Sequence, residues 1–155
     1  MKPASIQEIK QALQSLPPTR LTEVCLRLAR FKKDNKELLT YLLFESADEA
    51  AYIAQIKKEI DIEFEGLPKP NLYLTKKSLR KVLRSILRQI RYTGSPQAEV
   101  ELLTHFLGKM RAIPFRESQV LVNLYHQQLK KIRSIIARLH EDLQYDYLKQ
   151  LQSLD

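Results

Sequence analysis

The sequence predicts an all-α fold of seven or eight helices packed as antiparallel hairpins. Apolar residues recur with the helical period along most of the chain, and only one segment alternates with the period of two that is typical of strands. The breaks between these segments are short, and each contains a proline, a glycine or a capping residue. The chain has 155 residues, of which 44% are hydrophobic, so we expect a single all-helical domain over residues 1–155 with a core of its own.

Two helices are expected at the N-terminus. Ser5 is a suitable N-cap for the first helix, which runs to about Ser15 and is ended by "LPP". The second helix is expected from about Pro18 to Phe31. Its apolar side chains share one face, which indicates a surface helix that packs with that face: Leu21, Val24, Cys25 and Leu28.

A third helix is expected to start after Asp34 or Asn35 and to carry "KELLTYLLFE". This segment is so rich in Leu, Tyr and Phe that we expect a central helix, buried on most sides. Asp48 opens the fourth helix and Gly66 ends it. Within it "EIDIEFE" also has a strand-like alternation, but a lone strand would have no partner, so a helix is favoured.

The segments "LRLARFKKDNKELLTYLLFE" and "DEAAYIAQIKKEI" resemble the N-terminal part of uncharacterised bacterial all-helical proteins. The resemblance covers about a quarter to a third of the chain. It implies a helical fold and a bacterial source. It implies no functional residue, because that family has no known motif.

The connector "GLPKPN" is the one proline-rich break in the middle of the chain, and it marks a hinge at most, over residues 66–74. Thr75 is expected to cap the fifth helix, which "TGSP" ends. Ser95 then caps the sixth helix, with Pro96 as its first residue. After Pro114, one long helix and two helices with a break near His140 fit the pattern equally well.

Two architectures fit this order of helices. One is a short superhelix of helical hairpins, of the armadillo or HEAT type, and the other is a compact orthogonal bundle. No strict repeat is present, and the tetratricopeptide and ankyrin patterns are absent. Both architectures therefore stay open.

The positive charge of the chain is concentrated in one helix. The net charge is +8, and the segment from Lys69 to Tyr92 has eight Lys or Arg residues and no Asp or Glu, which leaves the remainder neutral. Five of these cations follow steps of 4, 3, 4 and 3 residues and therefore share one helix face. We call them the cationic stripe: Lys77, Lys81, Arg84, Arg88 and Arg91. The opposite face is apolar and contains Leu79, Leu83, Ile86 and Ile90.

The apolar face is expected to be core. Its Leu, Ile and Val side chains contribute about 10–15 kcal/mol together when buried, which is comparable with the net stability of a whole domain. Docking on a membrane would need this face to be exposed to lipid, and the helix lacks the aromatic residues that often accompany such docking. The stripe is therefore expected to be exposed to solvent.

Three interpretations of the stripe remain open. It is a solvated face that acidic residues just upstream partly neutralise, or a site for an anionic partner, either a protein or a small phosphate, or a contact for a nucleic-acid backbone. The upstream acids are Glu59, Asp61, Glu63 and Glu65. A nucleic-acid site would be extended by Arg27, Arg30, Lys32, Lys33 and Lys36 and would not read base sequence.

The chain lacks the patterns that catalysis requires. Its three glycines are far apart, so no phosphate-binding loop is present. Cys25 lies on an apolar helix face and is expected in the core, and the spacing of the histidines does not match a metal site. The acids Glu45, Asp48 and Glu49 are expected to serve the start of a helix. We expect no catalytic residue, no cofactor and no metal.

The expected function is that of a non-catalytic helical binding or adaptor module, in which the cationic stripe contacts an anionic partner. The alternative is a sequence-nonspecific nucleic-acid backbone binder. A cytoplasmic location is the simplest expectation, because the chain has one cysteine, no transmembrane segment and no signal peptide in "MKPASIQEIKQ".

Overall fold

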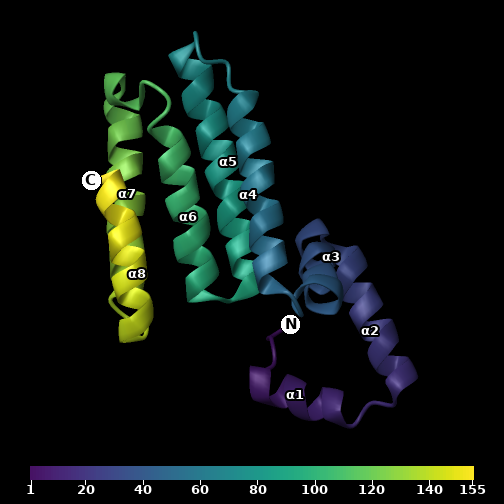
Figure 1. The fold of residues 1–155 in the computed structure, drawn as a ribbon. Helices are drawn as coiled ribbons and strands as arrows, with labels where there is room; N and C mark the ends of the chain where they lie inside the picture. The colour runs from purple at the N-terminus through teal and green to yellow at the C-terminus, as the bar shows by residue number, and fades with distance from the viewer. The chain divides into compact units, whose positions relative to one another are not determined.

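The computed structural model describes residues 1–155 and consists of helices, without strands (Figure 1). The expected all-α class is confirmed. The α-helices are α1 (Ile6–Gln14), α2 (Pro18–Phe31), α3 (Lys33–Thr40), α4 (Glu49–Glu65), α5 (Leu72–Thr93), α6 (Pro96–Met110), α7 (Gln119–Ile136) and α8 (Glu141–Leu151). A π-helix follows α3 at Tyr41–Glu45, and two short 3-10 helices are formed by Phe115–Glu117 and Gln152–Leu154. None of the helices combines the length and the apolar character needed to cross a membrane.

The chain divides into two compact units, Met1–Phe44 and Glu45–Asp155. The hinge expected at residues 66–74 lies inside the second unit, in the turn between α4 and α5, whereas the division falls between Phe44 and Glu45. That the two units act as a single domain stays a prediction. Each unit is described by itself.

The first unit contains α1, α2 and α3. Ser5 caps α1 as expected: its hydroxyl accepts a hydrogen bond from the Glu8 N–H, and the Glu8 carboxylate accepts one from the Ser5 N–H at 2.7 Å. Helix α2 packs on α3, and the Asn35 amide donates to the Leu28 carbonyl at 2.8 Å across their junction. The third helix begins at Lys33, before the expected start, because the extended residue that precedes it already breaks α2.

The expectation that the third helix is central and buried on most sides is wrong. In the predicted segment "KELLTYLLFE", which covers α3 and the π-helix after it, Tyr41 is the one buried side chain, whereas Leu42, Leu43 and Phe44 are 54%, 64% and 75% exposed. Within its unit, α3 packs mainly on α2, so only one of its sides is covered. The apolar content of "KELLTYLLFE" indicates a hydrophobic helix. Burial on most sides also requires a neighbouring helix on each of those sides, which the sequence pattern does not show.

The second unit contains α4 to α8, which lie side by side and alternate in direction (Figure 1). The expected antiparallel hairpins are therefore confirmed, while the superhelical arrangement stays a prediction. Helix α6 packs against α4, α5 and α7, and α8 packs on α7. The core is centred on α6, where six large side chains have 0% exposure: Val100, Leu102, Leu103, Phe106, Leu107 and Met110.

Capping residues set most of the helix boundaries in the second unit. The Asp48 and Ser95 side chains accept hydrogen bonds from the first turns of α4 and α6, as expected. Thr75 does not cap α5. Asn71 does, and its side chain accepts from the Leu74 N–H, because the residues between them are already helical. The Thr75 hydroxyl instead donates to the Pro68 carbonyl at 3.0 Å and holds the preceding turn against α5.

The C-terminal helical segment is broken near His140, as one of the two expectations required. Helix α7 ends at Ile136, and the His140 ring accepts a hydrogen bond from the Asp142 N–H at the start of α8. Helix α8 can then turn back along α7. The C-terminal end is fixed there by the Tyr125 hydroxyl, which donates to the Leu154 carbonyl at 2.6 Å.

Two glycine substitutions are expected to change stability in opposite directions. Gly94 ends α5 with a φ of 60°, so Gly94→Ala forces an L-residue into the left-handed region and should cost about 1–2 kcal/mol. Gly108 is exposed inside α6 with no atom near its missing Cβ, so Gly108→Ala should stabilise the fold by about 0.5–1 kcal/mol. Urea unfolding of both variants measures this, and shifts of the same sign would contradict the assigned boundaries of α5 and α6.

Candidate anion-binding groove

Helix α5 separates its charged and apolar side chains as the sequence predicts. Leu79, Leu83, Ile86 and Ile90 are between 0% and 8% exposed and face the core of the second unit. On the other side, four members of the cationic stripe are exposed: Lys77, Lys81, Arg84 and Arg91. The fifth member, Arg88, is half-buried, so that part of the expectation does not hold.

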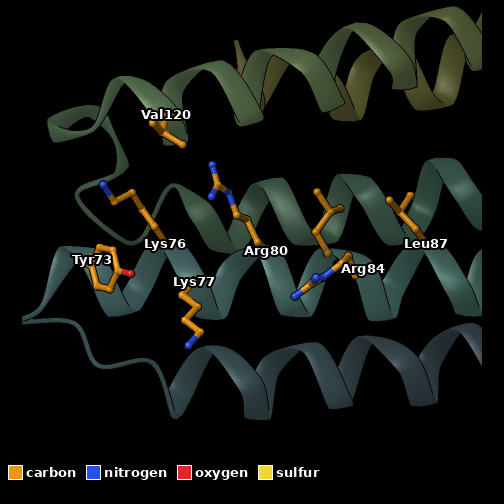
Figure 2. Close-up of a pocket in the computed structure, with 8 residues that line it drawn as sticks. Tyr73, Lys76, Lys77, Arg80, Arg84, Leu87 and Val120 are labelled. Carbon is orange, nitrogen blue, oxygen red and sulfur yellow. The ribbon is translucent and has the colours of Figure 1, made fainter.

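A groove of about 540 Å³ follows the exposed side of α5 (Figure 2). Four cations line it: Lys76, Lys77, Arg80 and Arg84. Leu83 and Leu87 of α5 and Val120 of α7 supply its apolar surface. Figure 2 shows Lys76 and Arg80 pointing toward the side of Val120, whereas Lys77 points toward α4. No carboxylate lines the groove.

The groove cations form no ion pair within the protein, and neither do Lys81 and Arg91. The cations of the neighbouring helices behave differently. Lys57 binds Glu101 at 2.9 Å, Lys109 binds Asp61 at 2.8 Å, and Lys131 binds Glu99. Three acids, Asp61, Glu99 and Glu101, are therefore used in contacts between helices other than α5.

The expected neutralisation of the stripe by upstream acids is not found as ion pairs to its exposed members. Asp61 accepts hydrogen bonds from Lys109 and from His105, at 2.7 Å for the latter. The Lys109 ammonium holds the pKa of Asp61 below its ordinary value, and His105 adds to this against the opposing effect of burial. Glu59 accepts a hydrogen bond from Gln55 on its own helix.

The cationic stripe is divided between two hollows. Lys77 and Arg84 belong to the groove, whereas Lys81, Arg84 and Arg88 line a second cavity of about 440 Å³ between α4 and α5. Glu59 and Glu63 of α4 also line this second cavity, so its potential is mixed rather than cationic. Arg91 lines neither hollow.

The sequence analysis missed several groove residues, which are Tyr73, Lys76, Arg80 and Val120. A signal for two of them exists, because residues 76, 80 and 84 follow each other at the helical spacing of four. Val120 has no such signal, since it comes from α7 and meets α5 only in the folded chain. The additional cations expected from Arg27 to Lys36 lie in the first unit.

The other residues that the sequence singled out have structural contacts. His105 pairs with Asp61 between α6 and α4, and His126 lies edge-on to the Tyr125 ring. Cys25 is half-buried beside an apolar groove and does not lie in a core, because α2 has only one packing partner in its unit. No three His, Cys, Asp or Glu side chains are grouped so that they could hold a metal ion.

Comparison with known proteins gave no family for the chain. No protein-family model, no curated protein and no solved structure matched it. The resemblance of its N-terminal third to uncharacterised bacterial proteins therefore stays a prediction. The functional argument depends on the chemistry of the groove itself.

The Asp61 contacts give a prediction for the pH dependence of stability. Because its folded pKa is lowered, Asp61 stabilises the fold above its unfolded pKa, and this contribution is lost as the pH falls through the folded value. Asp61 is partly exposed, so Asp61→Asn should cost about 1 kcal/mol or less at pH 7. The difference between wild type and variant should shrink below about pH 4.

Urea unfolding at pH 7 and pH 3 measures this effect, with Glu65→Gln as the control, since Glu65 is exposed and makes no ion pair. A difference of the same size at both pH values would contradict the assigned role of the Asp61 carboxylate.

Proposed function

We propose that this protein is a non-catalytic binding or adaptor module whose groove on α5 receives an anionic partner. The observation that carries the proposal is the set of four cations, Lys76, Lys77, Arg80 and Arg84, which line one groove without a carboxylate and without an internal ion pair. Contacts with an anion would satisfy all four.

The fold itself gains little from these charges. Lys76, Arg80 and Arg84 are four residues apart on one helix, and each like-charged pair at this spacing costs about 0.2–0.5 kcal/mol. The opposite face of α5 would be buried equally well if the exposed side had uncharged polar residues in place of the cations. A bound anion reverses the sign of this electrostatic term, which is the physical reason to assign the charges to binding.

The geometry of the groove suits an elongated anion. From Lys76 to Arg84, α5 rises by about 12 Å, so the cations follow a line rather than surround a point. Arginine binds carboxylates and phosphates through two parallel hydrogen bonds, and lysine adds a mobile point charge. Both acidic peptides and nucleic-acid backbones present anions along such a line.

One observation favours the nucleic-acid alternative. Tyr73 is 71% exposed at the end of the groove, next to Lys76 and Lys77, where an unpaired base could stack on its ring. A single exposed aromatic residue beside a line of cations fits backbone binding with no reading of sequence. An acidic protein would use the same cations and leave Tyr73 with a minor role.

Binding measurements on three labelled probes test the proposal: a polyglutamate peptide, a DNA duplex and a DNA single strand. The double variant Lys77→Ala, Arg84→Ala should weaken binding of the true ligand class by roughly tenfold or more at low salt, because charge-assisted hydrogen bonds are lost. The control double variant Lys130→Ala, Lys149→Ala removes the same charge from exposed sites outside the groove and should have little effect.

Two readouts separate the ligand classes: the salt dependence of binding to DNA, and which of the three probes binds. For duplex DNA, the slope of log affinity against log salt should become shallower by about 2 in the groove variant, since about 0.9 counterions are released for each phosphate contact. Binding of polyglutamate alone would favour the acidic protein. No binding of any probe at low salt, or equal losses in the groove and control variants, would overturn the assignment.

A further inference from the structure

The first unit exposes most of the large apolar side chains that the protein leaves in solvent. It provides eleven of the seventeen, although it holds only residues 1–44. Tyr41 is its one buried residue. This unit is close to the size of about 40 residues below which a chain usually needs further stabilisation, such as oligomerisation. Its apolar faces show which partner fits.

Helix α1 has an apolar stripe that packs on no helix of its unit. Ile6, Ile9 and Leu13 are spaced by three and four residues and so share one face, which we call the α1 stripe. Ile6 is 82% exposed and Ile9 is 43% exposed. The opposite face is polar and includes Gln11.

Helices α2 and α3 form an apolar groove of about 230 Å³, which we call the α2–α3 groove. Its lining residues are Cys25, Leu28, Ala29, Asn35, Leu38, Leu39 and Leu42. Leu28 and Leu42 are 57% and 54% exposed. The hydrogen bond from Asn35 to the Leu28 carbonyl fixes the junction of the two helices, so the groove exists before anything occupies it.

The connection between α1 and α2 is short and contains proline, and α1 does not pack closely on α2 or α3 of its own chain. Only Ser15–Pro17 join the helices, and Pro17 is extended at φ −66° and ψ 153°. A proline also disfavours the helical conformation for the residue before it, here Leu16. Short, stiff connections of this kind favour exchange of a segment between two copies over closure within one.

We infer that the first unit is a self-association module in which α1 of one copy lies in the α2–α3 groove of a second copy. The exchange is reciprocal. A two-fold axis relates the two copies, so both stripes are covered and both grooves are filled. A nine-residue helix is about 13.5 Å long, and two such contacts bury on the order of 1,000 Å² in total. That area is at the lower end of specific interfaces, and the dimer is accordingly weak and reversible.

A mixed disulfide experiment tests the contact directly, because the chain has a single cysteine, Cys25, in the groove. One chain carries Ile9→Cys with Cys25→Ala, and the other, longer by an affinity tag, keeps its native Cys25. Mild oxidation of the mixture should give the mixed dimer in several-fold higher yield than a control chain with Gln11→Cys and Cys25→Ala. Equal yields would overturn the inference.

Sedimentation equilibrium tests the energetics of the same contact. Wild type should dimerise reversibly, and Ile9→Glu should raise the dissociation constant roughly tenfold or more, because a charge then enters an apolar groove twice per dimer. Gln11→Glu adds the same charge on the polar face and should leave the constant within about twofold. Circular dichroism controls for folding, which Ile9 does not support because it belongs to no core.

Three outcomes would contradict self-association through α1. The protein could remain monomeric up to about 100 µM, well above the range in which an interface of this size acts. The dimer could be unaffected by Ile9→Glu. A single chain with Ile9→Cys and native Cys25 could close an internal disulfide at high dilution, which would place the stripe in the groove of its own chain.

Discussion

The burial of the apolar side chains of α6 is the constraint on which the second unit depends. Six of its large side chains have no exposure, and α4, α5 and α7 pack around it. Each such side chain stabilises the fold by about 1.5–3 kcal/mol when it leaves water. Phe106 meets the Phe64 ring edge-on, with 5.6 Å between centroids, and so joins α6 to α4. With its apolar face turned to this core, α5 must direct its cations outward.

The same packing uses several acids in contacts between the helices around α6. Glu101 accepts hydrogen bonds from Lys57 and from the Tyr147 hydroxyl, and so connects α6 to both α4 and α8. Burial, followed by the nearby charge of Glu101, raises the pKa of Tyr147, so its hydroxyl stays a donor at physiological pH. Asp61, Glu99 and Glu101 thus bind Lys or His side chains on α4, α6 and α7, while the groove cations of α5 form no ion pair.

The two units solve the problem of burial differently. In the second unit five helices pack on one another, so the apolar faces of these amphipathic helices are buried in a core. In the first unit three short helices have equally clear patterns but only one pair of them packs. A helix pair can cover one side of each member and no more. The remaining apolar surface is then available for association, whereas the charged surface of the second unit is available for anions.

The sequence by itself determined the features that depend on neighbours within about four residues. Capping by Ser5, Asp48 and Ser95 and the opposite faces of α5 follow from local hydrogen bonds and helical geometry. Tertiary structure decided what depends on which helices meet. The exposure of the "KELLTYLLFE" helix, the pairing of Asp61 with α6 and the entry of Val120 into the groove were not predictable, because burial and ion pairs are set by partners distant in sequence.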